Sequence, residues 1–468
     1  MKSSVSIRFL GAAGTVTGSK YLLQVKDKSI LIDCGLFQGL KNLRLMNWQP
    51  LPIEGDAIDL ILITHGHLDH VGYLPRIVQD GFKGEIWGTS PTLQIAKLIL
   101  EDSAKIQEED AARANRYGYS KHKKALPLYD LKAVSRTIPH FRNQPLNQWM
   151  EIAPGLRVRF KYNGHILGAT YLEVQVDDQV IVFSGDIGRL NDPLLFSPEG
   201  PQKANVIVME STYGDRVHPG DTSERLADII NRSLINEGTI IVPSFAVERT
   251  QLLMYLLWQL KKSKKIKDIP IYMDSPMGTN VLDVFHHNPS WHRLSVEDCS
   301  AMCESIVRVK TLDETLRLAS DHRSKIIIAG SGMASGGRVL TYLEHYLGNE
   351  KATILLAGYQ GEGTRGRQLL EGAQEIKLYG KYYQVRASVE NIEGLSAHAD
   401  QTELLHWLNK LTSAPEKIFI THGESSSSIA LQKKILDTYG WSSVIPKLDQ
   451  TVELGEAGWR HSTTDIKD

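Results

Sequence analysis

The chain has 468 residues, of which 42% are hydrophobic and 23% are charged, and its formal net charge is −1. These values are those of an ordinary globular protein, and a chain of this length is expected to form two domains. A nearly neutral chain has no overall field that attracts polyanions, which disfavours a protein that coats DNA through its net charge. Any contact with nucleic acid therefore requires a local basic surface.

The three cysteines, Cys34, Cys299 and Cys303, are too few and too unevenly spaced for a disulfide framework. We expect them to be reduced thiols in a cytoplasmic protein. The N-terminus lacks the apolar core of a signal peptide, and no stretch approaches the length of about eighteen apolar residues that a membrane span needs. Neither secretion nor a membrane span is expected.

The chain begins with three predicted strands, at residues 5–10, 21–25 and 29–32, with glycine-rich turns between them. The third strand leads into Asp33, which precedes Gly35. On spacing alone, Asp33 is equally consistent with a turn-forming aspartate and with a residue that approaches a functional site at the strand end.

A cluster of potential metal ligands follows the buried strand predicted at residues 58–63. It reads Thr-His-Gly-His-Leu-Asp-His and places His65, His67, Asp69 and His70 within six residues. A loop at a strand end can aim several side chains at one point, which a regular strand or helix would not do at this spacing. Imidazole and carboxylate groups without a nearby thiolate suit a hydrolytic metal such as zinc. A histidine-rich surface loop is the alternative.

A charged helix is predicted from residue 92 to about residue 114, followed by a segment that mixes basic and aromatic side chains over residues 116–129. Single-strand nucleic-acid channels have such a mixture, but an ordinary basic loop is the favoured interpretation. Two further predicted strands, at 157–162 and 179–183, lead to His165 and Asp186. After the histidine cluster, these two residues are best interpreted as the remaining ligands of a two-metal centre.

Helices and strands alternate from about residue 221 to residue 378, which predicts a parallel α/β sheet large enough to be a separate domain. Within it, a glycine-rich turn over residues 330–338 follows a predicted strand and precedes a helix, so its backbone amides could cradle a phosphate. The chain then returns through Ser-Ala-His at 396–398 and Thr-His-Gly-Glu at 421–424.

This ordered set of motifs resembles the β-CASP nucleases of the metallo-β-lactamase superfamily. That group includes bacterial and archaeal ribonucleases and the endonuclease subunit of the eukaryotic messenger-RNA 3′-end cleavage machinery, and the short bacterial members are the most similar. The resemblance implies an α/β fold: an αββα sandwich formed by residues 1–212 and 380–468, with an inserted β-CASP domain over residues 213–379.

The resemblance also implies roles for individual residues. One zinc ion would be held by His65, His67 and His165, and a second by Asp69, His70 and His422, with Asp186 shared between them. Asp33 would support the ligands from behind, and Asp69 would also orient the attacking water. His398 would act as a general acid or stabilise phosphate charge, and Glu210 would orient either His398 or a neighbouring ligand. The residues proposed to contact substrate phosphate are Arg249, Ser331, Gly332, Met333 and Ala334.

The implied function is that of a zinc-dependent ribonuclease that hydrolyses single-stranded RNA internally, from the 5′ end, or both. His422 favours RNA, because family members that act on DNA typically have an apolar residue at that position. One alternative is a small-molecule hydrolase of the lactonase or thioesterase type on the same metal centre, and another is a catalytically silent RNA-binding subunit. The oligomeric state is left open, with a homodimer among the states considered.

Overall fold

The computed structural model describes residues 5–118, 123–220, 222–358, 360–455 and 458–461. It divides into two compact units, of which unit 1 combines Met1–Val217 with His398–Asp468 and unit 2 is His218–Ala397. The expected domain boundary at residue 379 lies inside unit 2. The reason is that β19 (Ser388–Ile392) pairs in parallel with β16 (Thr353–Ala357) and so completes the sheet of that unit.

Unit 1 contains two sheets. The first has eight strands, in the spatial order β23 (Gly458–His461), β22 (Thr451–Gly455), β1 (Val5–Phe9), β2 (Tyr21–Val25), β3 (Lys28–Ile32), β4 (Leu60–Leu62), β5 (Glu85–Gly88) and β6 (Phe141–Asn143). The second has seven strands, in the order β21 (Ser443–Val444), β20 (Lys417–Thr421), β11 (Val206–Glu210), β10 (Gln179–Phe183), β9 (Thr170–Val176), β8 (Leu156–Tyr162) and β7 (Met150–Ala153).

Each sheet of unit 1 combines antiparallel and parallel pairing. The chain from β1 to β3 and from β7 to β10 forms antiparallel meanders. In contrast, β3 to β6 and the group β10, β11, β20 and β21 pair in parallel. Parallel neighbours end at the same edge of a sheet, so residues that follow them are brought together although they are far apart in the sequence.

The two sheets pack face to face through apolar side chains that alternate along the strands, as β8 illustrates by burying every second residue. The shared core includes Phe9, Ile30, Phe160 and Phe183. By contrast, every residue of β11 is buried, because this strand is covered on both faces.

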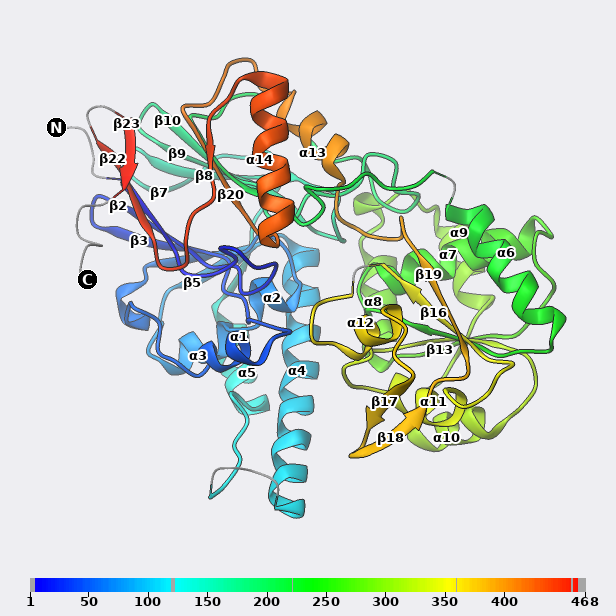
Figure 1. Ribbon diagram of the computed structural model, residues 1–468. Coiled ribbons are helices and arrows are strands. Elements are labelled where there is room, and N and C mark those ends of the chain that lie inside the picture. Colours follow the sequence, from blue (N-terminus) through cyan, green and yellow to red (C-terminus); the bar gives the residue numbers. More distant parts are fainter. Residues whose placement is uncertain (1–4, 119–122, 221, 359, 456–457, 462–468) are drawn as a thin grey trace. The chain divides into compact units, whose positions relative to one another are not determined.

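Helices cover the outer faces of this sandwich, with α13 and α14 on one side and α1 to α5 on the other (Figure 1). Their bounds are α1 (Lys41–Met46), α2 (Leu68–Val71), α3 (Leu74–Gln79), α4 (Ser90–Tyr117), α5 (Leu131–Thr137), α13 (Gln401–Leu408) and α14 (Ser425–Tyr439). Trp407 of α13 and Leu431 of α14 are buried with Ile207 and Ile418 of the second sheet. The expected αββα sandwich is confirmed.

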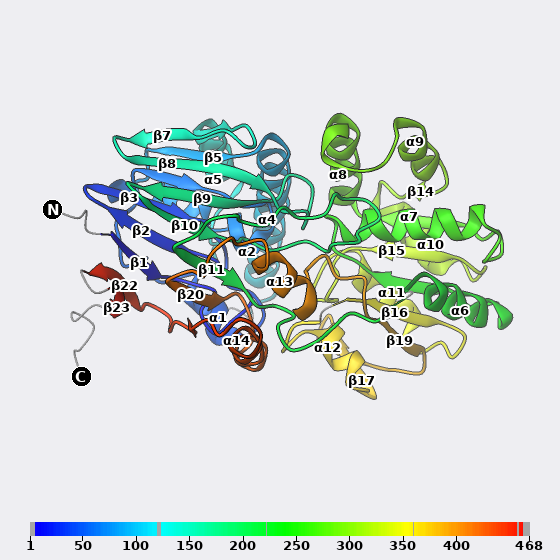
Figure 2. The same ribbon diagram turned by 90° about the horizontal axis from the view of Figure 1, so that it is seen from above.

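Unit 2 is built on a six-stranded parallel sheet. Its spatial order is β14 (Val307–Arg308), β13 (Ile271–Asp274), β15 (Ile326–Ala329), β12 (Ile240–Pro243), β16 and β19. The helices are α6 (Thr222–Ile235), α7 (Arg249–Lys262), α8 (Pro276–His287), α9 (Val296–Glu304), α10 (Leu312–Ser320), α11 (Val339–Tyr346) and α12 (Arg365–Leu370). A separate hairpin consists of β17 (Glu375–Leu378) and β18 (Lys381–Gln384). Seen from above, helices lie on both faces of this sheet (Figure 2), which confirms the expected α/β insert.

No helix in the described parts of the chain is both long and apolar enough to cross a bilayer.

Candidate metal centre

Most of the predicted site residues of unit 1 gather at one edge of its two sheets, because they lie at the end of a strand or shortly after one. Asp33 follows β3, the cluster from His65 to His70 follows β4, His165 follows β8 and Asp186 follows β10. Glu210 is the last residue of β11, and His422 directly follows β20. The structure therefore brings together seven potential ligands that the sequence spreads over more than 350 positions.

The first group of ligand atoms comes from His65, His67, His165 and Asp186. His67 Nδ1 lies 3.2 Å from His65 Nε2 and 3.2 Å from His165 Nε2. Asp186 Oδ2 lies 3.4 Å from His65 Nε2 and 3.5 Å from His165 Nε2. Three of the four side chains are fully buried, and the fourth, His67, is partly exposed.

The second group comes from Asp69, His70 and His422. The Nε2 atoms of His70 and His422 are 3.2 Å apart, and His422 Nε2 lies 3.5 Å from Asp69 Oδ2. Asp186 contacts this group through its other oxygen, since Oδ1 lies 3.3 Å from His70 Nε2. One carboxylate thus presents a separate oxygen to each group.

These separations fit metal coordination. An ion about 2.0–2.1 Å from four tetrahedral corners keeps those corners about 3.3–3.4 Å apart, and the measured separations between neighbouring donor atoms are 3.2–3.5 Å. Within the described chain, the buried Asp186 Oδ1 accepts no hydrogen bond. Buried polar atoms normally have a partner, and a cation bound between this oxygen and the rings of His70 and His422, which lie 3.3 and 3.5 Å from it, would supply one.

Three polar side chains outside the two ligand groups contact the ring nitrogens of ligand histidines. Asp33 Oδ2 lies 2.7 Å from His70 Nδ1, and the same carboxylate accepts from the backbone N–H of Thr64. Thr64 Oγ1 lies 3.1 Å from His65 Nδ1, and Thr212 Oγ1 lies 3.1 Å from His422 Nδ1. Such contacts fix the ring orientation and tautomer of a histidine ligand.

The sequence did not reveal the roles of Thr64 and Thr212. The only sequence signal is a hydroxyl residue next to the ligand His65 or two residues after Glu210, near a strand end. Such residues are too common for a role to be assigned on that basis alone. Two of the site residues themselves have left-handed backbone, Asp33 with φ of 56° and His422 with φ of 48°. Left-handed backbone in non-glycine residues is uncommon and often occurs at functional sites.

His398 belongs to neither of the two groups, but it lies beside them. Its Nδ1 atom is 3.2 Å from Glu210 Oε2 and 4.0 Å from Asp186 Oδ2. Glu210 is buried and also accepts hydrogen bonds from the backbone N–H groups of Ile187 and Thr212, at 2.5 and 3.3 Å. Glu210 is therefore placed to orient His398.

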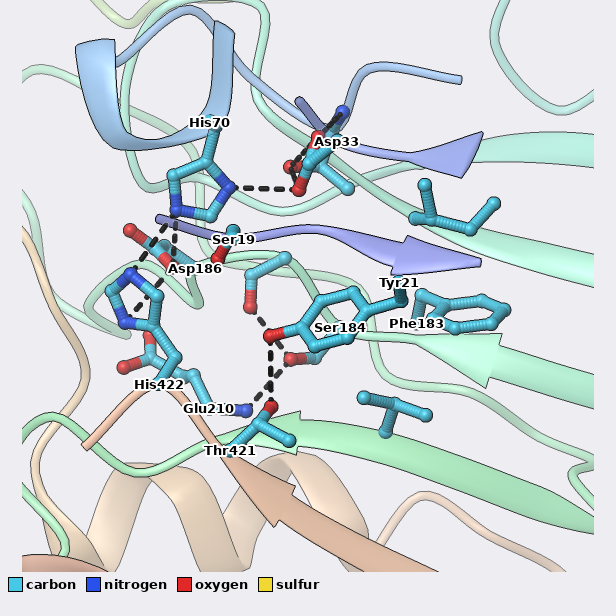
Figure 3. Close-up of a pocket in the computed structure, with 14 residues that line it drawn as sticks. Ser19, Tyr21, Asp33, His70, Phe183, Ser184, Asp186, Glu210, Thr421 and His422 are labelled. Carbon is cyan, nitrogen blue, oxygen red and sulfur yellow. Dashed lines mark hydrogen bonds and ion pairs between the residues drawn. The ribbon is translucent and has the colours of Figure 1, made fainter. Parts of the chain in front are cut away.

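A small cavity of about 10 Å³ lies beneath the second group (Figure 3). This is about the volume that one water molecule needs. Tyr21 contributes to its wall, and its hydroxyl donates to Thr421 Oγ1 at 3.0 Å. The space next to the side chains of His70 and Asp186 is therefore almost completely filled, which limits their movement.

The electrostatics of the site favour added positive charge. Burial lowers the pKa of His65 to about 3 and that of His67 to about 4, so both rings are neutral at neutral pH, as metal ligands must be. Burial also lowers the pKa of His70, but the carboxylates of Asp186 and Asp33 outweigh it and raise that pKa above its ordinary value. A carboxylate-rich pocket that draws a proton onto a buried histidine also favours a metal cation.

Burial and neighbouring charges also shift the pKa in opposite directions at His398 and at the two ligand carboxylates. Burial lowers the pKa of His398, but the neighbouring Glu210 carboxylate outweighs it and raises that pKa. Burial raises the pKa values of Asp69 and Asp186, whereas nearby histidines, His422 first among them, hold both well below their usual range.

Three family models match the chain in order. They are the metallo-beta-lactamase superfamily over residues 13–243, the Beta-Casp domain over 250–369, and the Zn-dependent metallo-hydrolase RNA specificity domain over 382–446. Among curated proteins, Ribonuclease TTHA0252 of Thermus thermophilus is 30% identical over 431 residues, covering 90% of this chain and 94% of that protein. The chain belongs to the β-CASP family of metallo-β-lactamase ribonucleases.

Other relatives agree with this assignment. Transcription termination factor FttA of Methanococcus maripaludis is 29% identical over 449 residues, covering 92% of this chain and 68% of that protein. A crystal structure of a protein of unknown function from Enterococcus faecalis aligns with a TM-score of 0.53 at 13% identity, covering 96% of this chain and all of that one. At that identity the likeness concerns the fold alone.

In this β-CASP protein, the glycine-rich turn of unit 2 is folded upon itself. The N–H groups of Ser331 and Ala334 donate to the carbonyls of Gly336 and Ser331, so they already have partners. In the described chain, the amides of Gly332 and Met333 have no such bond. Among the proposed phosphate-loop residues, only these two amides are left without a backbone partner, and Gly332 itself is buried.

Arg249, the fifth residue predicted to contact phosphate, is buried rather than presented to solvent. Its guanidinium Nη1 donates to the carbonyl of Ala357, at the end of β16. In this structure Arg249 therefore fixes the turn after that strand.

Proposed function

We propose that this β-CASP protein holds two zinc ions and hydrolyses phosphodiester bonds of single-stranded RNA. The observation that carries the proposal is the pair of ligand groups that share Asp186 through different oxygens. Nitrogen and oxygen donors with tetrahedral separations suit zinc. Similarity to a ribonuclease over 94% of its length supports RNA as the substrate, as does the match to an RNA specificity domain.

Zinc ions at this site would acidify water and neutralise charge that develops on the phosphate. Hydrolysis joins the oxygen of water, which loses a proton, to phosphorus and breaks the bond to the leaving ribose oxygen, which takes up a proton. The Asp69 carboxylate, at the partly exposed side of the site, would orient the water. His398, oriented by Glu210, would donate the proton to the leaving oxygen.

Elemental analysis and RNA cleavage test this proposal together. Purified protein should contain two zinc ions per chain and cleave RNA, and a chelator should abolish cleavage until zinc is restored. Asp186→Ala should lose activity and at least one ion, whereas the control Asp59→Ala, which removes a partly exposed carboxylate paired with Lys28, should lose neither. A single ion per chain in fully active protein would refute the shared-carboxylate assignment.

The choice of substrate separates the remaining alternatives. Cleavage of a circular RNA would establish internal attack, and a preference between 5′-phosphorylated and 5′-triphosphorylated linear RNA would reveal recognition of the 5′ end. Rapid hydrolysis of lactones or thioesters with no cleavage of any RNA would refute the ribonuclease proposal in favour of a small-molecule hydrolase.

A further inference from the structure

Helix α4 extends well beyond the part that packs against the sandwich. Its buried residues lie mainly between Pro91 and Ala104, and beyond them only Ala114 is buried. The C-terminal part of α4 and residues 123–130, which lead into α5, extend away from the rest of unit 1 (Figure 1). We call residues 105–118 and 123–130 the α4 arm. Residues 119–122, part of the basic and aromatic segment noted in the sequence, lie outside the described residues.

Side-chain hydrogen bonds hold the two segments of the α4 arm together. The Asn115 side chain donates from Nδ2 to the carbonyl of Ala125 at 2.9 Å and accepts from the N–H of the same residue at 2.7 Å. Nearer the body, Gln107 Oε1 accepts from the N–H of Leu128 at 3.0 Å. Side-chain amides thus replace the pairing that a β-hairpin would provide, and they hold the returning chain against the helix.

Charge is segregated along the arm. Nearer the body the arm carries three carboxylates and one cation, namely Glu108, Glu109, Asp110 and Lys105, whereas four cations lie toward the tip. These cations are Arg113, Arg116, Lys123 and Lys124. All four are exposed, and among the described residues none forms an ion pair with a carboxylate. The net negative charge nearer the body disfavours a polyanion along that part of the helix, so the arm attracts one mainly at its tip.

The tip also presents an aromatic ring. Tyr117 is 67% exposed, and the guanidinium of Arg116 lies 5.7 Å from its ring centroid. Cations in the last turn complement the helix dipole, and Arg113 and Arg116 would suffice for that. Lys123 and Lys124 lie beyond the helix end at Gly118, where the dipole does not require them.

We propose that the tip of the α4 arm binds the phosphate backbone of single-stranded RNA, with Tyr117 stacking on a base. Unpaired cations around an exposed aromatic ring are the combination that recognises single strands, since phosphate and a base face are present in every nucleotide. An acidic protein would need the cations but not the ring. The proposal deepens the proposed function and rests on RNA being the substrate.

The first test removes the charge. The variant Arg113→Gln, Arg116→Gln, Lys123→Gln and Lys124→Gln keeps helix-compatible side chains. The matched control replaces four other exposed lysines of unit 1 with glutamine: Lys410, Lys433, Lys434 and Lys447. The probe is a fluorescent oligouridylate with 2′-O-methyl and phosphorothioate groups, which resists hydrolysis by the zinc-loaded protein.

The salt dependence of affinity identifies phosphate contacts. If all four cations contact phosphate, the slope of log affinity against log salt should fall by about 3 in magnitude in the arm variant. Between about 50 and 200 mM salt, the deficit of the variant relative to the parent should therefore shrink about fiftyfold. The control should keep the parental slope. An unchanged slope in the arm variant, or an equal change in the control, would overturn the proposal.

The second test removes the aromatic ring of Tyr117. It tests RNA binding at the tip independently, in case the quadruple variant does not fold. Tyr117→Ala should weaken binding of the same oligonucleotide at least about fivefold without changing the slope, whereas Tyr117→Phe should bind like the parent. Parental affinity for Tyr117→Ala would overturn the stacking contact.

The two proposals fail in different ways. A parent that cleaves no RNA would refute the proposed function, whereas a parent that cleaves RNA and arm variants that bind it normally would refute the arm assignment alone. The latter result would leave an acidic protein as the occupant of the tip.

Discussion

Replacement of His398 by alanine separates chemistry from metal binding, because His398 lies beside both ligand groups and belongs to neither. A positioned acid typically contributes about 10²–10⁴-fold, so His398→Ala should slow single-turnover RNA cleavage by that factor. Glu210 would keep its hydrogen bonds from two backbone N–H groups. The free energy of unfolding should therefore fall by no more than about 1.5–3 kcal/mol, the usual contribution of one hydrogen bond to a charged group.

The assay compares two substrates and three variants. Natural RNA has a poor leaving group that needs a proton, whereas a nitrophenyl phosphodiester does not, so the deficit of His398→Ala should shrink on the activated substrate. His67→Ala should fail at metal loading, and His345→Ala, at an exposed position of α11, should behave like the parent. Loss of a metal ion from His398→Ala, or RNA cleavage at the parental rate, would refute the reasoning. An equal deficit on both substrates would refute acid catalysis specifically.

Three further outcomes follow from particular contacts. Asp33→Asn keeps a residue that tolerates the left-handed backbone but weakens the contact to His70, so zinc affinity, measured by chelator competition, should fall about 10–100-fold. Gly332→Ala places a Cβ 2.5 Å from Phe245 Cδ2 and should destabilise the fold by about 1–3 kcal/mol in thermal unfolding; an unchanged melting temperature would contradict the packing. A hydrogen bond from Cys299 lowers the pKa of Cys303 to about 7, so mass spectrometry should find Cys303 alkylated first, at a rate that rises with pH up to about 7 and then levels off.

The sequence alone indicated that the site could bind metal ions. The cluster from His65 to His70 is local, and its strand-end position follows from the preceding apolar run, so four potential ligands could be predicted from a single stretch of chain. His165 and Asp186 each follow a predicted strand, but it was their order after the histidine cluster that marked them as ligands rather than turn residues. The alternation of helices and strands after residue 221 likewise predicted the α/β insert, since this pattern depends only on neighbouring residues.

The tertiary structure decided which of these groups meet and through which atoms. His70 and His422 are 352 positions apart, and only parallel pairing in two packed sheets brings their rings together. The two oxygens of Asp186 face different ligand groups, and Arg249 is turned inward to a backbone carbonyl. The direction of a side chain depends on the packing around it, and that packing comes from distant parts of the chain. Residue type and spacing therefore indicated that a metal could bind, whereas sheet register and burial determined how the ligands are arranged.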